Sequence, residues 1–193
     1  MMKATNTLFP IFLRADRLQI LIVGGGSVAE EKLHFLFKNS PDAHVTLVAT
    51  SISEAVLGYA HQFDITFYHR PYQSSDIEYG DLIIAATDIA PLNESIRKDA
   101  RSAGKLINVA DQPALCDFYL GGVVTKGDIK IAISTNGKSP TLAKRLRQLL
   151  ENNLPNELNT LADHLHKARP LFGKDFKRKV EELNTLTASL IEN

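Results

Sequence analysis

The sequence predicts an α/β protein in which a doubly wound parallel sheet is followed by a β-hairpin and a small helical C-terminal part. Three observations lead to this prediction. Short apolar runs alternate with amphipathic segments over roughly the first 110 residues, as in parallel strands that are buried on both faces and joined by helices. Two later apolar runs are separated only by a tight-turn sequence, which joins antiparallel strands. The remaining residues carry helical periodicity alone.

The first part of the chain predicts five strands and three helices. The run LQILIV, which ends at Gly24, is nearly continuous and therefore indicates a strand buried on both faces. Apolar residues then recur at helical spacing from Ser27 until Pro41 stops the pattern. Either Ser51 or Ser53 is expected to cap the second helix. The predicted strands are 18–23, 44–49, 65–69, 81–86 and 105–109, and the predicted helices lie within 27–40, 51–59 and 91–103.

The second part of the chain begins with the hairpin, whose strands are predicted over 118–125 and 129–134. Ser139 and Pro140 then supply an N-cap and a first-turn proline for a helix that Pro155 ends. Two more amphipathic helices, broken around Pro170 to Gly173, are expected in the remainder of the chain. The predicted domains are 1–112, 113–150 and 151–193. Because a hairpin of this size buries little surface alone, we expect the middle domain to form a homodimer.

Composition excludes several classes of function. The 22 basic and 22 acidic side chains leave no net charge, so a nucleic-acid partner is not favoured. No apolar run reaches the roughly 18 residues of a membrane span, and the first six residues lack the layout of a signal peptide. The one cysteine, Cys116, excludes an internal disulfide, and the six histidines lack ligand-like spacing, so no metal site is expected. We therefore expect a soluble protein of the reducing cytoplasm, with no membrane partner.

A glycine-rich motif follows the first predicted strand and opens the first predicted helix. Residues 24–29 read GGGSVA, which fits the dinucleotide-binding pattern G-x-G-x-x-A within a strand–helix–strand unit. Gly24 permits the tight turn, Gly26 lets the backbone approach a pyrophosphate, and Ala29 allows close helix packing. The helix N-terminus would offer its unpaired N–H groups and the positive end of its dipole to the phosphates. The alternative is a glycine-rich turn without a ligand, but the position of the motif favours a Rossmann-like nucleotide site.

The end of the second predicted strand lacks the acidic residue that usually binds the adenosine ribose. It reads Val48, Ala49, Thr50, Ser51, so the hydroxyls of Thr50 and Ser51 and the backbone would have to serve instead. No arginine or lysine occurs there for a 2′-phosphate, which favours NAD over NADP. Alternatively, Thr50 and Ser51 cap the next helix, and both roles are compatible.

An aspartate, Asp111, stands at the carboxyl end of the fifth predicted strand, where open α/β sheets bind their ligands. A carboxylate there can take a proton as hydride leaves a neighbouring carbon, and Asn108 lies beside it as a candidate substrate contact. A turn-forming aspartate ahead of Pro113 is an equally good interpretation of the spacing.

The loop STNGKS at 134–139 resembles a phosphate-binding loop but lacks the required glycine at Ala132, and a hairpin precedes it. A polar loop that leads into a capped helix still suits an anionic substrate. Ser134 and Lys138 are therefore candidate substrate contacts.

Six separated motifs occur together in a familiar order: LFPIFL at 8–13, GGGSVAEEK at 24–32, AATD at 85–88, NVAD at 108–111, CDF at 116–118 and ISTNGKSPTLA at 133–143. On these motifs the chain resembles the precorrin-2 dehydrogenase and sirohydrochlorin ferrochelatase family, the dehydrogenase part of siroheme synthases. The resemblance spans about residues 8 to 150 and implies an NAD-binding domain, an interlocking dimerisation domain and a small helical domain. It also implies oxidation of precorrin-2, a tetrapyrrole, with NAD, and in some members insertion of ferrous iron. On length alone it implies no fused methyltransferase domain.

The resemblance also assigns individual residues. It places cofactor contacts at Ser27, Val28, Thr50 and Ser51. It places a shared dehydrogenation and chelation aspartate at Asp111, and a substrate-site serine at Ser134. This chain departs from the family at Glu31, where arginine is common, and at 120–122, where LGG replaces a segment that usually carries proline.

Three functions follow from these observations. The leading one is NAD-dependent oxidation of precorrin-2 to sirohydrochlorin. A narrower alternative adds ferrochelatase activity, with ferrous iron as a substrate. A third, of another class, is a redox-sensing regulatory protein that binds NAD without turnover.

Overall fold

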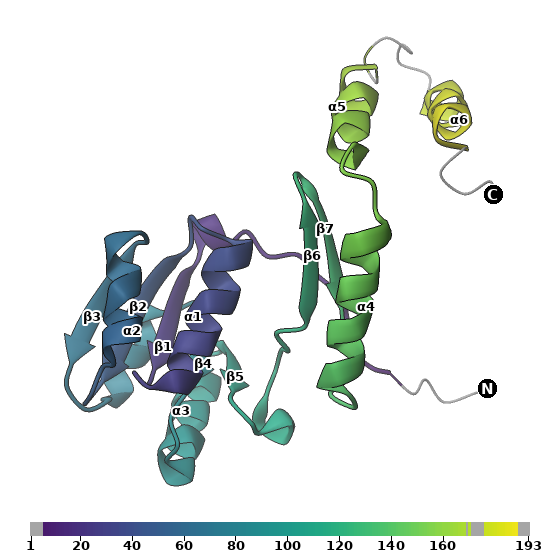
Figure 1. Cartoon of the computed structure of the whole chain (residues 1–193). Coiled ribbons are helices and arrows are strands. Elements are labelled where there is room, and N and C mark those ends of the chain that lie inside the picture. The colour runs from purple at the N-terminus through teal and green to yellow at the C-terminus, as the bar shows by residue number, and fades with distance from the viewer. Residues whose placement is uncertain (1–5, 169, 171–175, 189–193) are drawn as a thin grey trace. The chain divides into compact units, whose positions relative to one another are not determined.

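The computed structural model describes residues 6–168, 170 and 176–188. The chain divides into two compact units, one formed by residues up to Leu120 with Asn136–Lys138, the other by Gly121–Thr135 with the residues from Ser139 onward (Figure 1). The three-domain division predicted from sequence stays a prediction. Among the described residues, no helix combines the length and apolar character needed to cross a membrane.

The first unit is built on the predicted parallel sheet. Its strands are β1 (Gln19–Val23), β2 (His44–Ala49), β3 (Ile65–His69), β4 (Leu82–Ala85) and β5 (Leu106–Val109), in the spatial order β3-β2-β1-β4-β5. All four pairings are parallel, and Val23 at the end of β1 lies between Val48 of β2 and Ala85 of β4. The strand order therefore reverses between β1 and β4, where such sheets bind ligands.

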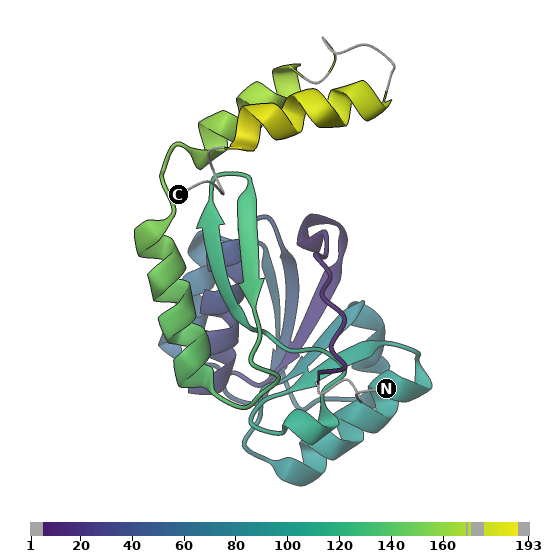
Figure 2. The ribbon, with the colours of Figure 1, turned by 90° about the vertical axis from the view of Figure 1, so that its right-hand side faces the viewer.

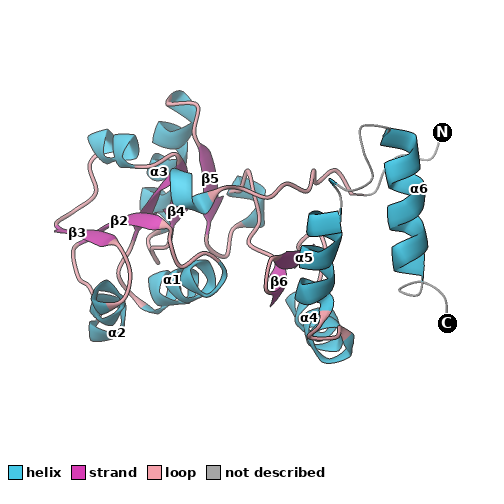
Figure 3. Cartoon of the chain, turned by 90° about the horizontal axis from the view of Figure 1, so that it is seen from above, coloured by secondary structure: helices cyan, strands magenta, loops and turns pink. Residues whose placement is uncertain are grey.

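Helices cover both faces of this sheet. Figure 3 shows α1 (Ser27–Asn39) and α2 (Glu54–Gly58) on one side of the strands and α3 (Ala90–Ser102) on the other. The side chains of β1 explain the arrangement, because Ile20 and Ile22 join the core beneath α1 whereas Leu21 and Val23 join the core beneath α3. The predicted burial of this strand on both faces is confirmed. Short 3₁₀ turns complete the unit at Ala15–Arg17, Tyr59–His61, Ser74–Tyr79 and Pro113–Leu115.

Of the two serines considered as caps for α2, the structure selects Ser53. Its hydroxyl accepts a hydrogen bond from the N–H of Val56 at 3.3 Å. The alternative in which Thr50 and Ser51 cap the helix is therefore wrong. The reason is that α2 begins at Glu54, two residues later than Ser51 could reach.

The second unit begins with the hairpin of β6 (Gly122–Lys126) and β7 (Ile129–Ile133), joined through Gly127 and Asp128. The first strand starts four residues later than predicted, because Phe118 and Leu120 pack against the core of the first unit. A Cβ on Gly121 would lie 2.3 Å from the Ile133 carbonyl oxygen, so the hairpin needs glycine at this position.

Three helices complete the second unit: α4 (Pro140–Asn153), α5 (Leu158–Ala168) and α6 (Phe176–Thr187). Ser139 caps α4 as predicted, accepting from the N–H of Leu142 at 3.1 Å. Figure 2 shows α4 alongside the hairpin, where it contacts both strands. Of the predicted break at 170–173, residues 171–173 lie outside the described residues.

Candidate functional site

The glycine loop after β1 is fixed by the ends of the neighbouring strands. Gly24 has a φ of +124°, a conformation that side chains rarely adopt. A Cβ on Gly24 would also lie 2.2 Å from the Ala86 carbonyl oxygen at the end of β4. Its N–H donates to the Val48 carbonyl at 2.9 Å. Gly24 therefore forms the tight turn for which the motif requires glycine.

Gly25, which the motif leaves unspecified, is also required. A Cβ there would lie 2.3 Å from the Ser51 carbonyl oxygen and 3.0 Å from the Ala49 side chain. Its own carbonyl accepts from the Ser53 N–H at 2.9 Å. This position thus attaches the glycine loop to the segment that carries Thr50 and Ser51.

Gly26 differs from both neighbours. Its φ of −93° suits any residue, and apart from Gly26 itself and its two chain neighbours no described residue has an atom within 4 Å of the position a Cβ would take. The first hydrogen bond of α1 runs from the Glu30 N–H to the Gly26 carbonyl, so the N–H groups of Ser27 and Val28 precede the helical ladder. A phosphate placed over Gly26 would meet these N–H groups without a steric obstacle.

Ala29 and the end of β2 complete this site. Ala29 is fully buried, as close packing of α1 on the sheet requires. Thr50 and Ser51 are exposed at the end of β2, and within the described chain neither hydroxyl makes a hydrogen bond. His69 at the end of β3 donates from Nε2 to the Thr50 carbonyl at 2.7 Å, because a carbonyl only accepts. The two hydroxyls are therefore available to a ligand.

Thr87 and Asn93 stabilise the loop after β4 on the other side of the switch point. The Thr87 hydroxyl donates to Asn93 Oδ1 at 2.7 Å, and Asn93 Nδ2 donates to the Thr87 carbonyl at 2.9 Å. Sequence reasoning missed this pair as part of the site, because Asn93 resembles a surface residue of α3 although it is 1% exposed. The sequence signals for Thr87 were its position just after a strand and its place in the AATD motif at 85–88, and neither indicates Asn93.

Asp111 occupies the turn after β5. Its φ is +58°, in the left-handed region, and the Gln112 N–H donates to the Val109 carbonyl across the turn at 3.3 Å. Aspartate tolerates this region better than most residues. The side chain is exposed, and no hydrogen bond or ion pair engages its carboxylate within the described residues. Asp111 is thus a turn residue whose carboxylate remains available for chemistry.

The three predicted substrate contacts lie in different surroundings. Asn108 is buried, and its amide donates to the Phe118 carbonyl at 2.9 Å. Lys138 is exposed and groups with the first unit, whereas the exposed Ser134 belongs to the second. The loop between them is held by Thr135 Oγ1, which accepts from the Ser139 N–H at 3.2 Å. Their roles as substrate contacts stay predictions.

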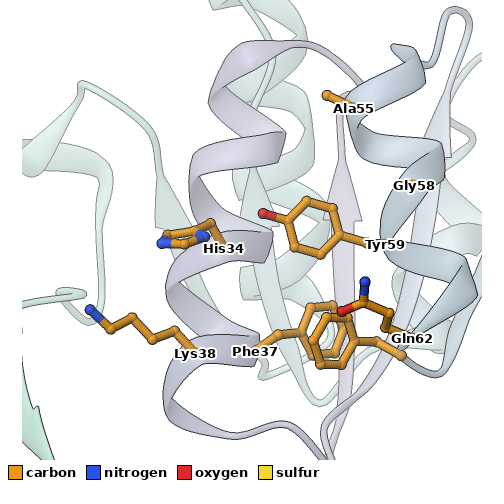
Figure 4. A pocket seen from close by; sticks show the side chains of 8 residues that line it. His34, Phe37, Lys38, Ala55, Gly58, Tyr59 and Gln62 are labelled. Carbon is orange, nitrogen blue, oxygen red and sulfur yellow. The ribbon is translucent and has the colours of Figure 1, made fainter.

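A cavity of about 400 Å³ opens elsewhere, between the C-terminal half of α1 and the α2 region (Figure 4). Phe37 and Phe63 line the cavity and stack with 4.1 Å between their ring centroids, and His34 and Lys38 also line it. It contains none of the predicted site residues. Because Phe37 is ten positions beyond Ser27, it lies about 15 Å along α1 from the glycine loop.

Comparison with known proteins identifies the first unit. Residues 11–122, more than half of the chain, match the family described as "Putative NAD(P)-binding". The chain belongs to this NAD(P)-binding family. The match contains the glycine loop, the end of β2 and Asp111, so the geometry above is that of an NAD(P)-binding domain. Residues 126–153 match the family described as "Sirohaem biosynthesis protein central".

Several relatives of this NAD(P)-binding chain are siroheme synthases. That of Pseudoalteromonas atlantica is 37% identical over 161 residues, covering 83% of this chain and 34% of the relative. That of Methylococcus capsulatus is 39% identical over 153 residues, covering 79% and 32%. The chain therefore spans about a third of the length of these relatives. The solved structure of SirC, a precorrin-2 dehydrogenase, has the same fold, with a TM-score of 0.71, 21% identity and coverage of 96% and 90%.

Proposed function

We propose that the chain is an NAD-dependent dehydrogenase that oxidises precorrin-2 to sirohydrochlorin. The observation that carries this proposal is the pairing of an open phosphate position over Gly26 with an unengaged carboxylate on Asp111 in one NAD(P)-binding unit. The names of the siroheme synthase relatives and of SirC support the choice of substrate.

The residues of the first unit fit NAD. Gly26 and the N–H groups of Ser27 and Val28 would hold the pyrophosphate, and the hydroxyls of Thr50 and Ser51 would hold the adenosine ribose. Arg70, just after β3, does not supply a cation for a 2′-phosphate, because its guanidinium is held by both carboxylate oxygens of Asp76 at 2.6 and 2.7 Å. This supports NAD rather than NADP.

Asp111 is the catalytic residue of the proposal. Oxidation of the macrocycle removes one hydride and one proton. Bound NAD supplies the hydride acceptor, and the Asp111 carboxylate takes the proton or orients the ring that loses it. Ser134 and Lys138 are proposed on the substrate side, where the ammonium of Lys138 suits a polycarboxylate. Asn108 is also proposed there, through its side-chain oxygen, because its amide N–H already donates to the Phe118 carbonyl.

The second unit supports a homodimer. Leu142, Leu146 and Leu149 follow helical spacing on one face of α4 and are 51%, 37% and 57% exposed. Such an apolar stripe favours burial against a second copy of the chain.

Two further points extend the proposal. The carboxylate of Asp111 is equally suited to accept the protons that ferrous iron displaces from the tetrapyrrole, so iron insertion is a second candidate activity. We also propose that the protein is cytoplasmic, because its single cysteine, Cys116, is a free thiol, as is usual in a reducing compartment.

A paired assay tests the function. NAD affinity is measured by calorimetric titration, and turnover is followed with precorrin-2 and NAD, with and without ferrous iron. The proposal predicts NAD binding and loss of precorrin-2. NAD binding without any turnover would instead support the regulatory alternative.

A further inference from the structure

The strand that leads to Asp111 lies at an edge of the sheet. β5 pairs with β4 on one side, and its other side lacks a partner strand in the described structure. Residues 116–118 cover this open edge instead. The Asp117 N–H donates to the Ile107 carbonyl at 2.7 Å, and the Ile107 N–H donates to Asp117 Oδ2 at 3.2 Å. The Asp117 carboxylate thus accepts the hydrogen bond that a backbone carbonyl of a neighbouring strand would otherwise accept at the sheet edge.

The thiol of Cys116 makes the second pairing. Its sulfur accepts from the Val109 N–H at 3.2 Å. Its S–H can donate either to the Val109 carbonyl oxygen, 3.2 Å from the sulfur, or to that of Gln112, 3.4 Å from it. Burial raises the pKa of this thiol, which keeps it protonated and able to donate at neutral pH. The thiol therefore reaches both backbone groups of Val109 and the turn beyond it.

These contacts close the base of the loop that carries Asp111. Residues 110–115 leave β5 at Val109 and return at Cys116, so the thiol bridges the two ends. Arg101 of α3 donates to Asp117 Oδ1 at 3.2 Å, and Asn108 donates to the Phe118 carbonyl, which anchors the returning segment. A left-handed residue such as Asp111 keeps its conformation only where the surrounding structure fixes the backbone.

We infer that Cys116 is a positioning residue, which together with Asp117 closes the 110–115 loop so that the Asp111 carboxylate is held at the carboxyl end of the sheet. The inference rests on the proposed function. It assigns Cys116 no contact with substrate or cofactor. This role explains why the CDF motif at 116–118 follows the NVAD motif at 108–111 so closely. The 110–115 loop begins within NVAD, and CDF closes it.

The first test compares Cys116→Ser with Cys116→Ala. Serine keeps a donor and an acceptor, so we expect kcat within about threefold of wild type, whereas alanine should lower kcat roughly tenfold or more. NAD affinity should stay unchanged in both variants. Phe63→Leu, which weakens the distant Phe37 stack, is the control for lost stability and should leave kcat unchanged. If Cys116→Ala does not fold, Asp117→Ala carries the same expectation. Wild-type kcat in folded Cys116→Ala, or in Asp117→Ala where that variant replaces it, would overturn the inference.

The second test asks whether Cys116 acts through Asp111. In an Asp111→Asn background, Cys116→Ala should cause no further loss of kcat, whereas a merely structural role would give the same fold-loss in both backgrounds. Equal losses would overturn the inference. A normal kcat for Asp111→Asn alone would instead overturn the catalytic assignment, so the two failures are distinguishable.

Discussion

The carbonyl oxygen of Ala86 lies 2.2 Å from the position that a Cβ on Gly24 would take, so the end of β4 and the turn after β1 are in direct contact. This contact joins the two strands at which the strand order of the sheet reverses. Gly26, two residues after Gly24, stays open on the side where the ligand would bind. The three glycines therefore have separate roles, and substitutions distinguish them.

Gly26→Ser and Gly26→Asp should abolish measurable NAD binding while the fold is kept. Serine and aspartate are good N-caps and meet no protein atom there, but they fill the phosphate position, and aspartate adds a repelling charge. Calorimetric titration and melting temperature check this. Gly25→Ala should behave differently, because its clash with the backbone of Ser51 should cost about 2 kcal/mol of stability. Unchanged NAD affinity in folded Gly26→Asp would remove the nucleotide-site assignment.

Asp111→Asn should leave fold and NAD affinity nearly intact and lower turnover roughly 10²-fold or more, the scale of a lost general base. Asparagine tolerates the left-handed φ of +58°, whereas Asp111→Ala should also lose about 1 kcal/mol of stability. Melting temperature, NAD affinity and precorrin-2 oxidation are measured on one preparation. Near-normal turnover would show that Asp111 is a turn residue only. Loss of iron insertion as well would indicate one shared site.

The Arg70–Asp76 pair predicts a pH-dependent stability. Burial alone would raise the pKa of Asp76, but hydrogen bonds from Arg70 and the Gln73 N–H hold it below its usual value. A carboxylate with a lowered folded pKa stabilises above its unfolded pKa, and this stabilisation is lost as pH falls through the folded value. Arg70→Gln should therefore cost about 2 kcal/mol at pH 7 and progressively less below about pH 4. Chemical denaturation across pH checks this. A loss of stability that is constant with pH would contradict the proposed ion pair. A changed preference of Arg70→Gln between NAD and NADP would contradict the proposal that Arg70 does not bind the cofactor.

The apolar stripe on α4 predicts a homodimer. Light scattering at micromolar concentration should give about twice the chain mass of 21.3 kDa. Leu146→Glu with Leu149→Glu should give a monomer, whereas Lys144→Glu, an exposed position on the other side of α4, should not change the mass. A wild-type monomer would overturn the homodimer.

The regular part of the fold was predictable because each buried strand carries its own apolar run and each helix its own cap or stop. The capping serine of α2 was not, since Ser51 and Ser53 offer the same hydroxyl and only the start of the helix separates them. The need for glycine at position 25 depends on Ser51, which lies 26 residues away in sequence. The start of β6 at Gly122 could not be predicted either, because Phe118 and Leu120 are apolar residues that occur both in strands and in core contacts outside strands.

For the candidate site, the sequence placed Gly24, Gly26 and Asp111 at loops that follow strands, and the structure places these loops at the carboxyl ends of β1 and β5. It did not predict that the Asn108 amide donates to the Phe118 carbonyl, nor the thiol contacts of Cys116. Such contacts depend on the distance between side chains and backbone across a loop, which residue types alone do not specify.

The proposed dehydrogenase transfers a hydride from precorrin-2 to NAD. The most direct test mixes the purified chain with precorrin-2 and NAD and follows the absorbance of NADH and of the tetrapyrrole together. The proposed dehydrogenase should form one NADH for each precorrin-2 consumed, and Asp111→Asn should slow both changes equally. Binding of NAD without formation of NADH, while precorrin-2 remains unchanged, would contradict the proposed dehydrogenase activity.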